Sequence, residues 1–117
     1  MQTQMLNAVQ TALPHQKGIE FGGVTLQGTC MRFERNEEVF GQDEPAEYVY
    51  RVVSGAVRTM RFTSEGRRQI LGFHLPGDIF GLELGDSHSL SAEAVVASDI
   101  VMVRPSAMEK MSIVRSW

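Results

Sequence analysis

The central part of the chain alternates apolar and polar residues in short runs that predict a β-sheet structure. Residues 48–53 are rich in Val and aromatic side chains, as strands are. Ser54-Gly55 supplies a tight turn, in which glycine takes a positive φ without steric cost. Residues 56–62 alternate with the two-residue period of a sheet that is exposed on one side, and a turn at 63–66 leads to a third strand at 67–75. These strands predict a compact β-roll core.

Shorter segments of the same kind flank this core. Further strands are predicted at residues 31–35, 38–40, 91–97 and 100–103. Loops or turns are predicted at the glycine-rich residues 18–28, at the acidic residues 42–46, at Pro76-Gly77, and at 84–90, where a single helical turn is the alternative. Because short strands at close spacing with many turns are typical of sandwiches, we expect a mainly β fold of the double-stranded β-helix or jelly-roll type with short flanking helices.

Both ends of the chain carry a helical pattern. The apolar residues of the leader have the spacing of one helical face, and Pro14 would end such a helix: Met5, Leu6, Val9 and Leu13. The leader is therefore either a short helix or partly disordered. Ser106 and Glu109 have the spacing of a capping box, followed by an apolar stripe of Met108, Met111 and Val114 or Ile113. We therefore divide the chain into a leader (1–20), a β-roll domain (21–104) and the start of a C-terminal helix (105–117).

Composition limits the classes of function. A chain of 117 residues is long enough for one domain with a real core. Its net charge of −3 lacks the basic surface that nucleic-acid binding needs. There is no signal-peptide pattern and no apolar run of membrane-spanning length, and the single cysteine suits a reducing compartment. We expect a cytoplasmic domain with no membrane contact that does not bind DNA by itself.

Three separated blocks of sequence resemble one known family: Val53-Ser54-Gly55-Ala56-Val57, Gly66-Arg67-Arg68-Gln69-Ile70 and Leu75-Pro76-Gly77-Asp78-Ile79-Phe80-Gly81. They are similar to the sensor domain of the catabolite-activator/fumarate-nitrate-regulator (CRP/FNR) family of bacterial transcription factors, and most similar to its FixK branch. The resemblance covers residues 32–111. It implies a homodimer in the intact regulator, contact with RNA polymerase, and DNA binding through a helix-turn-helix domain that follows a long dimerisation helix. Neither is present here, so we expect either part of a longer regulator or a stand-alone sensor domain, which by itself is a monomer or a weak dimer.

The resemblance also locates a nucleotide pocket that has lost its phosphate-binding residues. Nucleotide-binding relatives carry a Gly-Glu pair and an Arg-Ser-Ala segment, whereas this chain has Leu82 in place of the Glu and Leu90 in place of the Arg. No Lys or Arg occurs between Arg68 and Arg104, so a buried phosphate would have no cation. We predict no useful affinity for cyclic AMP or cyclic GMP. The vestigial pocket comprises Gly81, Leu82, Glu83, Leu90, Ser91 and Ala92.

Two interpretations of this pocket remain open. Leu82 and Leu90 either fill it as core residues or line a site retuned for another ligand. Because Glu83, Asp86 and Asp99 are the charges expected nearby, such a ligand would be apolar or cationic. The second interpretation makes the chain a ligand-sensing module with an altered pocket.

Other chemistry has weaker support in the sequence. Iron-sulfur regulators need several thiolates, and this chain has only Cys30, which is either a redox-sensitive thiol or a small buried hydrophobe. A cupin-type metalloenzyme would need clustered histidines, whereas His15, His74 and His88 are far apart, and only a chance convergence of His74 and His88 with Glu83 would make a metal site. We expect no catalytic residues, no metal, no cofactor and no enzymatic activity.

A small basic cluster surrounds the second predicted hairpin: Arg58, Arg61, Arg67 and Arg68. By resemblance, such a loop contacts RNA polymerase. The alternative is a solvated hairpin tip that Glu65 balances. Together these observations predict the N-terminal effector domain of a FixK-like regulator, which serves dimerisation and transcription activation.

Overall fold

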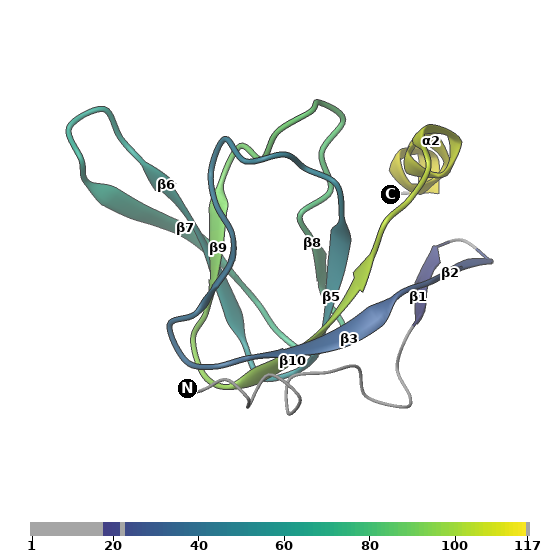
Figure 1. The fold of residues 1–117 in the computed structure, drawn as a ribbon, viewed down its shortest axis with the longest axis horizontal. Coiled ribbons are helices and arrows are strands. Elements are labelled where there is room, and N and C mark those ends of the chain that lie inside the picture. Colours follow the sequence, from purple (N-terminus) through teal and green to yellow (C-terminus); the bar gives the residue numbers. More distant parts are fainter. Residues whose placement is uncertain (1–17, 22, 117) are drawn as a thin grey trace.

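The structure is a computed structural model, and it describes residues 18–21 and 23–116. Its elements are β1 (Gly18–Phe21), β2 (Val24–Gln27), β3 (Thr29–Phe33), β4 (Glu38–Phe40), β5 (Val49–Ser54), β6 (Val57–Phe62), β7 (Arg68–His74), β8 (Ile79–Phe80), β9 (Ser91–Ala94), β10 (Ser98–Val103) and α2 (Ala107–Ser116). One antiparallel sheet has the strand order β3-β10-β5-β8 and the other has the order β4-β9-β6-β7 (Figure 1). The expected mainly β, jelly-roll class is confirmed.

Strand β5 contributes to two hydrophobic clusters, because alternate side chains of a strand point to opposite faces. Val49 belongs to the first cluster and Val53 packs against it. Tyr50 and Val52 belong to the second cluster. β5 is also hydrogen-bonded on both sides, to β10 and to β8. This strand therefore holds the core of the described domain together.

The first cluster also contains a hairpin that the sequence analysis missed. The prediction of a loop at residues 18–28 is wrong, because β1 and β2 pair in register from Gly18 with Gln27 to Phe21 with Val24 (Figure 1). Paired Ile19 and Leu26 are both buried in the cluster. The boundary proposed between residues 20 and 21 falls inside β1.

The C-terminal helix begins with the predicted capping box. The Ser106 hydroxyl accepts a hydrogen bond from the Glu109 amide at 3.1 Å, and the Glu109 carboxylate accepts one from the Ser106 amide at 2.8 Å. Ile113 is buried in the first cluster, whereas Met108 is 81% exposed. The predicted leader helix lies outside the described residues. None of the described helices is long and apolar enough to span a membrane.

The β6–β7 hairpin extends away from the rest of the domain, and α2 lies at the opposite end of the view (Figure 1). β7 is an edge strand of its sheet. Large apolar side chains on and beside the hairpin are exposed: Phe62, Ile70, Leu71, Phe73 and Leu75. Because exposed apolar edge strands readily pair with other chains, this surface is a candidate interface.

Two glycines make a matched test of this packing: Gly55, where the chain crosses from β5 in one sheet to β6 in the other, and Gly66, at the turn of the β6–β7 hairpin. Gly55 (φ 92°) and Gly66 (φ 82°) are both left-handed, but a Cβ on Gly55 would collide with the buried Ser98 hydroxyl, whereas one on Gly66 would meet open space. We expect Gly66→Ala to lower the free energy of unfolding by about 1 kcal/mol from backbone strain. Gly55→Ala should lower it by about 3 kcal/mol, because steric overlap adds to the strain. Urea unfolding of both variants checks this, and equal losses would contradict the packing described.

Candidate functional site

A cavity of about 280 Å³ lies where the resemblance places the nucleotide pocket. Its walls come from β4, β6, β7 and β8, from the segment directly after β8 and from the segment directly before β9. The lining residues are Phe40, Thr59, His74, Ile79, Phe80, Gly81, Leu82, Glu83, Ser89 and Leu90. Gly81 has a positive φ of 81°, and a Cβ there would meet the Tyr50 ring at 2.6 Å. A side chain at this position would therefore be both strained and obstructed, which explains why the segment that turns into the cavity begins with glycine.

The predicted pocket residues separate into two groups. Four of them line the cavity: Gly81, Leu82, Glu83 and Leu90. Ser91 and Ala92 are buried at the start of β9 instead, and the Ser91 hydroxyl accepts a hydrogen bond from the Gln42 amide at 2.8 Å. Ser91 therefore ties the β4–β5 loop to the sheet.

The charge of the cavity is the reverse of what a phosphate needs. Among the residues that the structure describes, no Lys or Arg lines the cavity. The charged group that lines it is the Glu83 carboxylate. This carboxylate accepts hydrogen bonds from the Ser89 amide at 3.0 Å and from the Ser89 hydroxyl at 3.1 Å. An anionic guest would meet a carboxylate and no cation.

His88 is a buried residue beside this cavity whose role the sequence did not reveal. Its side chain is 1% exposed and stacks on the Phe40 ring with centroids 3.7 Å apart. Neither ring nitrogen has a hydrogen-bond partner in the described part of the chain, and Nδ1 lies 3.9 Å from the Glu83 carboxylate. Burial lowers the pKa of His88, although Glu83 and Glu44 oppose the shift. His88 is therefore held as a neutral ring in the wall behind the pocket.

The two histidines in the described residues, His74 and His88, do not belong to a group that could hold a metal ion. His74 stacks on Phe80 with centroids 5.1 Å apart, and burial lowers its pKa as well. Within residues 18–21 and 23–116 no group of three or more potential ligands could hold a metal ion. His15 lies outside the described residues. The convergence of His74, His88 and Glu83 that a cupin-type site would require is not found there.

Within the basic cluster on the β6–β7 hairpin, a close ion pair with Glu93 distinguishes Arg58 from the other three arginines. Arg58 donates from Nε to the Glu93 carboxylate at 2.7 Å and from a terminal nitrogen to Asn36 at 2.9 Å. Arg68 also reaches Glu93, at 3.5 Å. Arg61 and Arg67 remain exposed. Arg58 thus lies in the sheet, paired across strands with Glu93, while the other three arginines lie closer to the turn.

Cys30 lies in the interior. Its side chain is fully buried in the first cluster. Burial raises the pKa of the Cys30 thiol and Asp99 adds to the rise, whereas Arg51 opposes it. Because the thiolate is the reactive form, this environment disfavours redox chemistry at Cys30.

Comparison with known proteins identifies the family. The cyclic nucleotide-binding domain family matches residues 30–113. This match spans most of the chain, so the chain belongs to that family. The resemblance to sensor domains of CRP/FNR transcription regulators, and to the FixK branch among them, is confirmed by the relatives described next.

The nitrogen fixation regulation protein FixK of Azorhizobium caulinodans is 49% identical over 85 residues, which are 73% of this chain and 34% of that protein. FixK of Rhizobium meliloti is 38% identical over 80 residues, 68% of this chain and 38% of that protein. The chain thus spans little more than a third of the length of these relatives. The solved structure of FixK2 from Bradyrhizobium japonicum is similar with a TM-score of 0.68 and 53% identity, covering 74% of this chain and 43% of that one. The curated relatives are named as regulators rather than enzymes, which agrees with the expectation of no enzymatic activity.

The buried imidazole of His88 should make stability depend on pH. Because its pKa is lower in the folded state than its ordinary value of 6.5, the unfolded chain binds more protons below that value. The contribution of His88 to the free energy of unfolding is therefore fully present above about pH 6.5 and is lost as the pH falls towards the folded-state pKa. We expect His88→Phe, which keeps the stacking on Phe40, to reduce the loss of melting temperature between about pH 7.5 and about pH 5.5, with His74 causing part of what remains. Thermal melts across this range check it. A variant with the same pH slope as the unmodified chain would contradict this account of His88.

Proposed function

We propose that this chain is the N-terminal regulatory domain of a FixK-like transcription regulator whose pocket does not bind cyclic nucleotides. The observation that carries the proposal is the electrostatic character of the cavity, which has Glu83 and no lining cation among the described residues. The proposed role in the intact cytoplasmic regulator is dimerisation, contact with RNA polymerase, and transmission to a DNA-binding domain outside this chain. Membership of the cyclic nucleotide-binding domain family and the FixK relatives support this role.

The physical argument concerns the cost of desolvating a phosphodiester. A buried anion loses its hydration, and a bidentate arginine or several amides must replace it. Here Leu90 lines the wall where the resemblance expects that arginine. Glu83 is fixed by Ser89, and its negative charge would repel the phosphate. The net interaction with a cyclic nucleotide is therefore unfavourable.

The proposed polymerase contact rests on the exposed part of the second hairpin. Arg61 and Arg67 are exposed, and Arg68 is partly engaged by Glu93. The guanidinium group of Arg58 is the least available of the four, because Glu93 and Asn36 both bind it. Within the cluster, we infer that Arg61 and Arg67 contribute most to any polymerase contact.

The proposed dimer interface rests on exposed apolar surface. Phe73 is 60% exposed on the edge strand β7, and the neighbouring Leu75 is also exposed. Met108 and Met111 are exposed on α2, on the side of the helix away from the buried Ile113. Apolar surface of this kind supports burial against a second copy of the chain in the intact regulator.

A second candidate function is a sensor for a ligand of different chemistry. It is favoured by the fact that Leu82 and Leu90 line an open cavity rather than closing it. Its apolar walls and one carboxylate suit an apolar or cationic molecule better than a phosphate.

Thermal melts with cyclic AMP test the absence of nucleotide binding. A ligand at about one hundred times its Kd adds about 2.7 kcal/mol of stability, so binding is readily detected. We expect no stabilisation of the unmodified chain at millimolar cyclic AMP or cyclic GMP. Leu90→Arg should gain a salt-sensitive stabilisation by cyclic AMP, whereas Leu90→Met, the matched apolar control, should not. Stabilisation of the unmodified chain would contradict the proposal.

Sedimentation tests the proposed dimer interface. We expect the 117-residue chain to be a monomer or a weak dimer, and we expect Phe73→Ser to raise the dimer Kd by roughly tenfold because an aromatic anchor is lost. Arg67→Ser, at the turn that precedes β7, is the control and should leave the dimer Kd unchanged. Self-association that Phe73→Ser leaves intact would place the interface elsewhere.

A further inference from the structure

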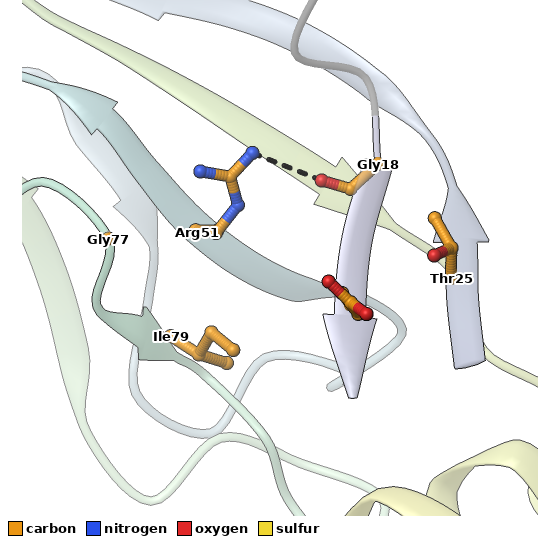
Figure 2. A pocket seen from close by; sticks show the side chains of 6 residues that line it. Gly18, Thr25, Arg51, Gly77 and Ile79 are labelled. Carbon is orange, nitrogen blue, oxygen red and sulfur yellow. Dashed lines mark hydrogen bonds between the residues drawn. The ribbon is translucent and has the colours of Figure 1, made fainter. Parts of the chain in front are cut away.

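A second cavity, of about 450 Å³, lies between the β1–β2 hairpin on one side and β5 and the start of β8 on the other. It is lined by Gly18, Glu20, Thr25, Arg51, Gly77 and Ile79. Figure 2 shows Arg51 reaching from β5 towards β1, with Ile79 and the backbone at Gly77 beside it. Among the described residues, Ile79 alone lines both this cavity and the cavity of about 280 Å³.

The guanidinium of Arg51 is held in place by a hydrogen bond, but no carboxylate in the described part of the chain forms an ion pair with it. One terminal nitrogen donates a hydrogen bond to the Gly18 carbonyl at 3.1 Å, and the other points away from Gly18 (Figure 2). Arg51 is only partly exposed, and none of the ion pairs in the described part of the chain includes it. An arginine has five N–H donors, so most of its donor capacity remains available.

We propose that this cavity is a binding site for a small organic monocarboxylate, with Arg51 as the residue that binds the carboxylate. The planar fork of an arginine matches the two oxygens of a carboxylate, and here the bond to Gly18 already fixes the orientation of that fork. Thr25 adds a hydroxyl to the wall and Ile79 adds an apolar surface for the organic part of the ligand.

The charges around the cavity favour a monoanion over a phosphate. Arg51 supplies one positive charge, and the exposed carboxylate of Glu20 also lines the cavity. A dianion would leave one charge without a cation and would meet stronger repulsion from Glu20 than a monoanion does. The site therefore selects for a single negative charge.

An NMR titration of the 117-residue chain tests the site, with butyrate, inorganic phosphate and butylammonium as probes. We expect butyrate to shift the Gly18 and Gly77 amides and the Arg51 Nε–H signal with saturation in the millimolar range, with phosphate weaker and butylammonium without effect. Arg51→Gln should abolish the butyrate shifts. Arg51→Lys should weaken binding without abolishing it, because the charge stays but the fork is lost.

A gain of affinity separates this proposal from a purely structural role of Arg51 as an anchor for the hairpin. Glu20→Gln removes the opposing carboxylate but leaves the backbone bond to Gly18 intact, so butyrate should bind about fivefold more tightly. Glu65→Gln, at the turn of the second hairpin, changes the net charge equally and should not alter binding. The proposal is overturned if butyrate causes no saturable shift, if the shifts persist in Arg51→Gln, if phosphate binds as tightly as butyrate, or if both Gln variants of the glutamates behave alike.

Discussion

The alternation of side chains along β5 is the constraint on which the rest of the structure depends. Val49, Arg51 and Val53 point to one face of the strand, and Tyr50 and Val52 point to the other. β5 lies between β10 and β8, so both of its edges are hydrogen-bonded, and each of its two faces contributes to its own hydrophobic cluster. A residue on β5 is therefore committed to one side of the domain, and moving it to the other side would require a shift in strand register.

The alternation of side chains along β5 explains why Arg51 lies at one of the two cavities and not at the other. Arg51 lines the cavity beside the β1–β2 hairpin, while the cavity of about 280 Å³ is built around Phe40 and Phe80 and contains Glu83. The domain belongs to a family named for cyclic nucleotide binding, yet the family pocket described here offers a phosphate no lining cation. His88 adds no positive charge to the wall behind this pocket, because its buried ring is held neutral and neither nitrogen has a hydrogen-bond partner among the described residues. The chain thus has the fold of the family, and its pocket carries one carboxylate and no lining cation among the described residues.

Much of the fold could be predicted from the sequence because its signals are local. The turn at Gly66 and the capping box at Ser106 depend on a few adjacent residues, and both are found as expected. Gly55 is left-handed as expected, but it connects β5 and β6 in two different sheets and does not close a hairpin. The β1–β2 hairpin was missed because its glycines resemble a loop, although the alternation that buries Ile19 and Leu26 was a usable signal.

The site was less predictable because its decisive contacts join distant residues. Arg58 was grouped with the hairpin arginines, and only the pairing of β6 with β9 brings it to Glu93. His88 carries no local sign that it will stack on Phe40, forty-eight positions earlier in the chain. Arg51 lies in a strand of apolar residues, and its role depends on a hairpin whose pairing was not predicted.

An NMR titration of the unmodified chain with cyclic AMP, observed at the backbone amides of Gly81, Ser89 and Leu90, tests the central claim most directly. These residues line the family pocket, so a bound nucleotide would perturb their signals. The account predicts no saturable change at these amides up to millimolar nucleotide. Saturable shifts there would show that the pocket binds the phosphate without a lining cation and would contradict it.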